Sequence, residues 1–139
     1  MKTLYTASAI THGGRAGKVE SSDGVLELDL SVPKEMGGDG GTGTNPEQLF
    51  AAGYAACFES ALRLVAGNQE KDLGDASIRA NVGLGRDSDG NFGLAVGLVG
   101  RMPNLPREEA EALMAEAHQV CPYSRATRGN VDVELTVED

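Results

Sequence analysis

The chain has 139 residues and a formal net charge of −9, from 21 acidic and 12 basic side chains. A nucleic-acid-binding surface needs a basic stripe to neutralise phosphates, so this charge balance argues against a nucleic acid partner. The length suits a single domain, residues 1–139, that can bury a substantial hydrophobic core.

The N-terminal segment Met1–Tyr5 is short and polar, unlike a signal peptide. We expect no apolar run to reach the ~18 residues that a membrane span needs. These features predict a cytoplasmic protein with no membrane partner. In that compartment the two cysteines of the chain are more often free, catalytic or metal-bound than joined in a structural disulfide.

The first third of the sequence predicts three strands. Residues 2–10 alternate loosely between apolar and polar, residues 18–20 form a short second strand, and residues 25–32 alternate with period two. A tight turn at 12–17 joins the first pair. The segment 21–24 carries an Asp-Gly step, which is typical of a type I′ hairpin turn. We therefore expect an antiparallel meander.

A glycine-rich loop at 33–44 leads into a long apolar segment. The loop lacks the Lys-Ser/Thr pair of a phosphate-binding loop, so we interpret it as a connection that could cover a neighbouring site. Residues 45–66 predict a helix that Asn45 or Thr44 caps and that a left-handed turn at 67–68 ends. Apolar residues occur on nearly all its sides, which predicts burial all round.

One face of this predicted helix is lined with small side chains, at Ala52, Gly53, Ala56 and Ser60. Small residues let a second helix approach closely. The sequence therefore leaves room on this face for another helix.

The second half of the sequence returns to strands. Residues 77–86 and 92–101 alternate in polarity and are joined by an Asp-Gly turn at 87–90. Residues 107–119 predict a helix with one apolar face, and residues 131–137 a closing strand. This order of elements predicts the α+β class, with antiparallel sheets around a long buried central helix.

The two cysteines lie in different settings. Cys57 is in the middle of the apolar helix, where burial raises a thiol pKa, so it becomes a nucleophile only if a cation reaches it. Cys121 precedes Pro122; if Pro122 opens a short helix, the free amides there favour a Cys121 thiolate. Both could also be small core residues without a chemical role.

Two charged residues could act with the cysteines. Arg15 lies among glycines at 13–17 and is either a cation for a thiolate or an ordinary surface arginine. Glu47 suits the start of the central helix by its charge alone, and it could also hold an arginine in an ion pair. His118 and Cys121 are three residues apart, a weak ligand pair, and we expect no metal site.

Three segments together resemble the organic hydroperoxide resistance (Ohr) branch of the OsmC/Ohr family. They are Gly13-Gly14-Arg15 with Ser22-Asp23-Gly24, residues 44–58, and residues 120–130. The likeness runs from about residue 3 to the end of the chain. Two departures are an enlarged glycine-rich loop around 39–43 and Arg125, where relatives often have Asn.

The resemblance implies an OsmC-like fold, an intertwined homodimer and a thiol peroxidase that reduces organic hydroperoxides to alcohols. It implies that Cys57 is the peroxidatic cysteine and Cys121 the resolving one, which reverses the ranking from the residues alone. Arg15 would stabilise the Cys57 thiolate, and Glu47 would hold Arg15. No bound cofactor or metal is implied, and the reductant would be a dihydrolipoyl-type dithiol, free or on a lipoyl-bearing protein.

The residues that flank Cys57 suggest the kind of substrate. They are apolar, and from this composition we expect a pocket for fatty or aromatic hydroperoxides, lined by Leu49, Phe50, Tyr54 and Phe58. Two alternatives stay open. One is an OsmC-branch peroxidase with a different substrate or reductant, and the other is a non-enzymatic dimer that binds a small molecule or metal.

Glu47 and Cys57 are ten residues apart on one predicted helix. At ~1.5 Å per residue they are about 15 Å apart along the helix axis. We therefore expect that Glu47 acts on Cys57 of a second chain, in an obligate homodimer.

Overall fold

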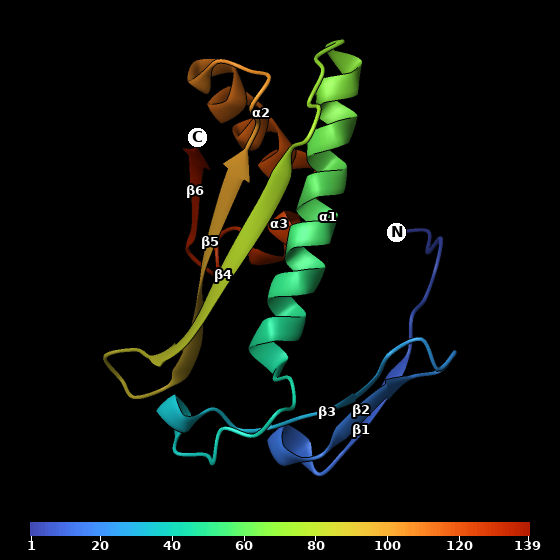
Figure 1. Cartoon of the computed structure of the whole chain (residues 1–139), viewed down its shortest axis with the longest axis vertical. Coiled ribbons are helices and arrows are strands. Elements are labelled where there is room, and N and C mark those ends of the chain that lie inside the picture. Colours follow the sequence, from blue (N-terminus) through green and yellow to red (C-terminus); the bar gives the residue numbers. More distant parts are fainter. The chain divides into compact units, whose positions relative to one another are not determined.

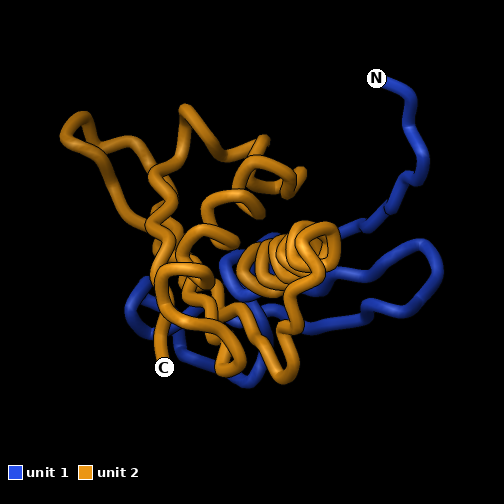
Figure 2. Tube along the Cα trace, turned by 90° about the horizontal axis from the view of Figure 1, so that it is seen from above, with its two compact units in different colours: residues 1–49 blue, residues 50–139 orange.

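The computed structural model describes residues 1–139 (Figure 1), which divide into two compact units, residues 1–49 and 50–139 (Figure 2). Three strands belong to unit 1; three strands and two helices belong to unit 2. A long helix, α1, begins in unit 1 and continues in unit 2. The α+β class is confirmed, whereas the single domain stays a prediction.

Unit 1 contains the predicted antiparallel meander. Strands β1 (Ala9–His12), β2 (Lys18–Ser21) and β3 (Glu27–Asp29) pair in that order. The outer strands are shorter than predicted because β2 has only four residues to pair with. After Asp29 the ladder with β2 ends, although the Leu30 N–H still bonds to Gly17 O. Leu30 also bridges to Thr44, which closes the glycine-rich loop. A short 3₁₀ turn, Lys34–Met36, lies inside that loop.

The Asp-Gly turn at 21–24 is wider than the predicted type I′ form, and the turn at 87–90 is not of that form either. A type I′ turn needs positive φ at both central residues, but only Gly24 (φ 76°) and Gly90 (φ 83°) have it here. The carboxylate of Asp23 accepts hydrogen bonds from the Ser21 hydroxyl and the Val25 N–H. Asp87 likewise accepts from two N–H groups of its own turn. Each turn therefore combines one left-handed glycine with an aspartate whose carboxylate accepts hydrogen bonds within the loop.

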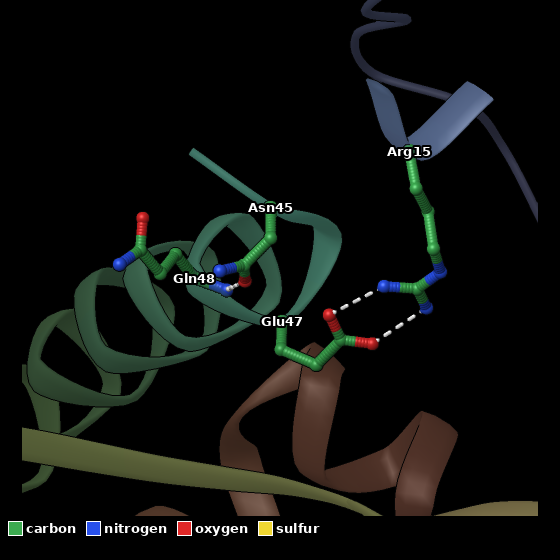
Figure 3. A network of polar contacts seen from close by, with 4 residues as sticks. All are labelled: Arg15, Asn45, Glu47 and Gln48. Carbon is green, nitrogen blue, oxygen red and sulfur yellow. Dashed lines mark hydrogen bonds and ion pairs between the residues drawn. The ribbon is translucent and has the colours of Figure 1, made fainter. Parts of the chain in front are cut away.

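Helix α1 spans Pro46–Asn68 and is capped at its start by Asn45. The Asn45 Oδ1 atom accepts the Gln48 N–H at 2.8 Å (Figure 3). The end of the helix differs from the prediction. The left-handed residue is Glu70 (φ 54°), not Gly67 or Asn68. The N–H of Lys71 bonds back to Ala66 O and that of Glu70 to Gly67 O, which is a Schellman ending.

The predicted burial of α1 on all sides is wrong for the single chain. A stripe at helical spacing is buried, namely Tyr54, Phe58, Ala61, Leu62, Val65 and Ala66. The small residues Ala52, Ala56 and Ser60 are exposed on the other side, and Leu64 keeps 56% of its surface. One chain supplies enough apolar partners for one side of this helix only.

Helix α1 is also long and apolar enough, by length and composition, to cross a membrane. The expectation that no segment approaches such a length is therefore wrong by this measure. The core helix of a globular protein meets the same criterion, and the buried stripe of α1 packs in the core of unit 2.

Unit 2 holds a second sheet and two further helices. Strands β4 (Ser77–Arg86) and β5 (Phe92–Arg101) form the long hairpin visible in Figure 1. Helices α2 (Arg107–Val120) and α3 (Pro122–Thr127) follow, and the chain returns as β6 (Val133–Glu138). Strand β6 pairs parallel to β5, so this sheet is not wholly antiparallel as predicted. A helical crossover brings the chain back in the same direction, which makes the pair parallel.

The core of unit 2 lies between the buried stripe of α1, the inner face of α2 and the middle of β5. The predicted apolar face of α2, formed by Ala110, Leu113, Met114 and Ala117, is buried as expected. From β5, Val96 and Leu98 join this cluster, and so does Cys121. The core therefore reaches the junction of α2 and α3, where Cys121 lies.

Candidate active site

Cys121 occupies the junction between helices α2 and α3. Its backbone N–H closes α2 by bonding to Ala117 O at 2.8 Å, and Pro122 begins α3 directly after it. Pro122 thus opens a short helix, which was the condition set for a helix start at Cys121. The Cys121 side chain is fully buried, so a substrate cannot reach it without a movement of the chain.

Cys57 and Cys121 are both reduced and lie next to each other. Their Sγ atoms are 3.6 Å apart, with the Cys121 thiol pointing to Cys57. A disulfide requires about 2.05 Å, so a shift of about 1.5 Å would join them. Cys57 is only partly buried. The two thiols thus differ in access: one can meet a substrate, and the other can meet only its neighbour.

The electrostatic setting of Cys57 combines opposing effects. Burial raises the pKa of its thiol, and the adjacent Cys121 raises it further, while a hydrogen bond from the Tyr123 backbone lowers it. Tyr123 is in the first turn of α3. The Tyr123 amide at this helix start therefore acts on Cys57, whereas the sequence suggested that the amides there would act on Cys121. The net pKa of Cys57 in the single chain stays above its ordinary value.

Arg15 and Glu47 form a bidentate ion pair within unit 1 (Figure 3). Arg15 Nη1 donates to Glu47 Oε2 at 2.9 Å, and Nη2 donates to Oε1 at 2.7 Å. The hydrogen bonds raise the pKa of Arg15 and lower that of Glu47, with burial opposing both effects. Glu47 is the better shielded partner, with 14% of its side chain exposed against 39% for Arg15.

The local backbone fixes the position of Arg15. It is in a 3₁₀ turn, Gly14–Ala16, between β1 and β2. Gly13 has a left-handed φ of 80°, and a Cβ atom on Gly17 would collide with the carbonyl oxygen of His12. Glycine is required at both ends of the turn, so the guanidinium projects from a tightly bent segment.

The four predicted pocket residues fall into two groups. Leu49 and Phe50 are partly buried, whereas Tyr54 and Phe58 have no exposed surface. Tyr54 and Phe58 are therefore core residues rather than walls of an open pocket, because both lie on the inward stripe of α1. A residue that we did not predict, Tyr123, is 43% exposed, and its ring packs on Gly53 of α1.

The sequence is similar to those of known proteins along nearly its whole length. The sequence model of the OsmC-like protein family matches residues 37–136. The organic hydroperoxide resistance protein of Xanthomonas axonopodis pv. citri is 53% identical over 137 residues, 98% of this chain and 96% of that protein. The chain belongs to the Ohr branch of the OsmC/Ohr family.

Solved structures of Ohr proteins agree with this assignment. The organic hydroperoxide resistance protein OsmC of Legionella pneumophila is 56% identical, with a TM-score of 0.93 over 99% of this chain and 100% of that chain. OhrB of Bacillus subtilis is 50% identical, with a TM-score of 0.89 over 98% and 100% of the two chains. The recognised family and the fold are thus supported by sequence and structure alike.

Beside the cysteines of this Ohr-branch chain lies a polar network that residue-level reasoning missed. The Tyr54 hydroxyl is 2.8 Å from Ser124 Oγ and 3.1 Å from Thr127 Oγ1. His118 Nδ1 is 2.8 Å from the same Ser124 oxygen. A buried tyrosine usually needs a partner for its hydroxyl, so Tyr54 in an apolar helix was the available signal. His118, considered above as a metal ligand, instead bonds to Ser124 through Nδ1.

Proposed function

We propose that this protein reduces organic hydroperoxides to alcohols, with Cys57 as the attacking thiol. The observation that supports this proposal most directly is the 3.6 Å separation of the Cys57 and Cys121 sulfur atoms in a chain of the Ohr branch. Relatives that are about half identical over nearly their full length are called organic hydroperoxide resistance proteins. This arrangement of the two thiols suits a reaction in which the peroxide first oxidises the accessible Cys57 thiol and the buried Cys121 thiol then forms a disulfide with it.

The proposed cycle has three steps. The Cys57 thiolate attacks the terminal peroxide oxygen, the O–O bond breaks, and the alkoxide takes a proton and leaves as the alcohol. Cys57 is then a sulfenic acid. The Cys121 sulfur attacks Cys57, the S–O bond breaks, and the oxygen leaves as water with the Cys121 proton. A dihydrolipoyl-type dithiol reduces the resulting disulfide by exchange and becomes a disulfide itself. No bound cofactor takes part.

The Cys57 thiolate needs a cation that its own surroundings do not supply. Burial raises the pKa of Cys57, and the Tyr123 amide compensates only in part. We assign this cation to Arg15, held in place by Glu47. An oriented guanidinium would also polarise the peroxide as charge develops on the leaving oxygen.

We further propose that this Arg15 comes from a second copy of the chain. Glu47 and Cys57 belong to one continuous helix, and ten residues separate them by about 15 Å along its axis. Because Arg15 binds Glu47 of its own chain, whichever copy provides Glu47 also provides Arg15. The exposed small residues Ala52, Ala56 and Ser60 of α1 would form the contact between copies, in a homodimer.

The apolar residues of α1 support a preference for hydrophobic peroxides. Phe50 is seven residues before Cys57, hence on the same side of the helix, and is partly buried. We propose fatty or aromatic hydroperoxides as substrates, with Leu49 and Phe50 in contact with them. The proposed setting is the cytoplasm, where a lipoyl-bearing protein or a small dithiol would serve as reductant.

The test is hydroperoxide consumption by the purified, reduced protein. One equivalent of cumene hydroperoxide should remove both free thiols and yield an intramolecular disulfide, seen by mass spectrometry as a loss of two hydrogens. Dihydrolipoamide should then sustain turnover better than thioredoxin. Two free thiols after exposure to the peroxide would refute the proposal and favour a non-enzymatic role. Better turnover with thioredoxin would overturn the proposed reductant.

A further inference from the structure

The hydroxyl groups of Tyr54, Ser124 and Thr127 form a buried network that ends at His118. Tyr54 and Ser124 have no exposed surface and Thr127 keeps only 5%. The network joins three elements, because Tyr54 belongs to α1, Ser124 and Thr127 to α3, and His118 to α2. No buried side-chain nitrogen or oxygen atom in the chain lacks a hydrogen-bond partner, so these groups satisfy one another.

The hydrogen atoms of this network can be assigned by counting. Thr127 Oγ1 donates to Ser124 O at 3.1 Å, so its oxygen must accept from Tyr54. Tyr54 has one hydroxyl hydrogen, so its oxygen must accept from Ser124. Ser124 then has none left for His118, and His118 Nδ1 must donate to it. All the contacts form only when His118 has a hydrogen on Nδ1, and bonds aligned in this way reinforce one another.

The position of the network relates it to the two thiols. Tyr54 is three residues before Cys57 on α1, and Ser124 is three residues after Cys121. The Tyr54–Ser124 hydrogen bond therefore ties α1 to α3 about one helical turn from the sulfur pair. Helix α3 has six residues, which is too short to be stable alone. Its placement must come from the groups that hold it.

We propose that the His118, Ser124, Tyr54 and Thr127 network holds α3 against α1, and so sets how readily Cys57 and Cys121 form a disulfide. The four are positioning residues, since none of them bonds to either sulfur. The same placement brings the Tyr123 backbone to Cys57. The inference deepens the proposed function and rests on it for the peroxide step, but the thiol pairing can be measured without peroxide.

The first measurement is the effective concentration of one thiol toward the other. It is obtained by equilibrating the protein with a mixture of reduced and oxidised glutathione. Tyr54→Phe keeps the ring and removes only the hydroxyl. We expect it to lower the effective concentration about tenfold or more, since a misplacement of about 1 Å can cost a reaction a hundredfold. Ser124→Ala should do the same, and the double variant should lose little more. Unchanged values for Tyr54→Phe and Ser124→Ala would overturn the proposal.

Two controls separate positioning from general destabilisation. Tyr5→Phe removes a hydroxyl from an exposed tyrosine in unit 1 and should leave the effective concentration unchanged. Val96→Ala, in the core on β5, should lower the melting temperature and leave the thiol equilibrium as in the wild type. If Val96→Ala lowers the effective concentration as much as Tyr54→Phe does, the effect reflects general loss of stability. That result would overturn the positioning role of the network.

The assigned direction of the network has its own test at His118. Asparagine can place an amide N–H where Nδ1 lies, whereas aspartate of the same shape can only accept. His118→Asn should keep the effective concentration within about twofold, and His118→Asp should lower it as His118→Leu does, by about tenfold. Equal values for the asparagine and aspartate variants would overturn the donor role of His118.

A single-turnover experiment links the network to the peroxide reaction. After one equivalent of cumene hydroperoxide, Tyr54→Phe should slow the formation of the Cys57 sulfenic acid less than it slows the disulfide step, because the first step loses only the help of the Tyr123 amide. Its disulfide should form more slowly, so that a dimedone adduct of Cys57 accumulates. Equally rapid disulfide formation in both proteins would contradict the proposal. If the wild type itself does not react, the proposed function fails, and the glutathione equilibrium still decides the role of the network.

Discussion

The sulfur atoms of Cys57 and Cys121 lie 3.6 Å apart although the residues are 64 positions apart in the sequence. Cys57 is partly exposed and Cys121 fully buried. The two thiols therefore have different roles although they are chemically alike, because only Cys57 can contact a molecule from solution first.

The two cysteines should fail in different ways when replaced. Cys57→Ser should abolish hydroperoxide reduction, because a serine hydroxyl is not ionised at neutral pH. Cys121→Ser should consume one equivalent of peroxide rapidly and then stop, with Cys57 as sulfenic or sulfinic acid. Rapid-quench mass spectrometry distinguishes these products. A first turnover that survives in Cys57→Ser and disappears in Cys121→Ser would invert the assignment.

Arg15→Ala should lower activity much more than stability. Removing an electrostatic donor from a water-excluded site costs ~3 kcal/mol in the transition state, or about a hundredfold in rate. The pKa of the Cys57 thiol should rise, which the pH dependence of its alkylation rate measures. Arg79→Ala, which breaks an exposed ion pair with Glu138, is the matched control and should change neither. An unaltered thiol pKa together with an unaltered rate in Arg15→Ala would refute this role.

The Arg15–Glu47 pair should make folding stability depend on pH in the acid range. The pair lowers the pKa of folded Glu47, so its contribution is complete above the unfolded pKa of about 4.3. It is lost as the pH falls through the lower, folded pKa. Glu47→Gln should therefore cost about 1 kcal/mol at neutral pH, and progressively less below about pH 4. Urea unfolding across this range measures it, with exposed Glu134→Gln as control; a pH-independent difference would contradict it.

Glu70→Gly should stabilise the protein by about 1 kcal/mol. Glu70 has a left-handed φ of 54°, which costs a residue with a Cβ atom and suits glycine. Its negative charge is also unfavourable at the carboxyl end of α1. Thermal unfolding should show a higher Tm for Glu70→Gly, and a smaller gain for Glu70→Gln, which removes the charge alone. A lower Tm for the glycine variant would show that this ending is not strained.

Mixing two inactive variants should restore activity if the site is shared between copies. Cys57→Ser chains keep Arg15 and Glu47, and Glu47→Ala chains keep both cysteines. After reassociation, a heterodimer has one complete set of groups at one of its two sites. Hydroperoxide turnover should therefore recover partly. Absence of recovery in confirmed heterodimers would place the cation and the thiol in one chain.

Local sequence signals determined much of the fold. Asn45 before Pro46 marked the start of α1, and the apolar spacing of Ala110, Leu113, Met114 and Ala117 marked the inner face of α2. Pro122 marked the start of α3. Caps and periodic burial depend on residues within a few positions of one another, so a linear sequence contains them. The resemblance to the Ohr branch rested on such contiguous segments and is confirmed by the comparisons.

Only the tertiary structure decided how distant groups meet. It showed which thiol is accessible, that the amino end of α3 faces Cys57, and that β6 runs parallel to β5. It buried Tyr54 and Phe58, which composition alone placed in a substrate pocket. It also joined Tyr54 to Ser124 and His118. Access, helix direction and hydrogen-bond partners depend on contacts between segments that packing brings together, and no local pattern records which segments those are.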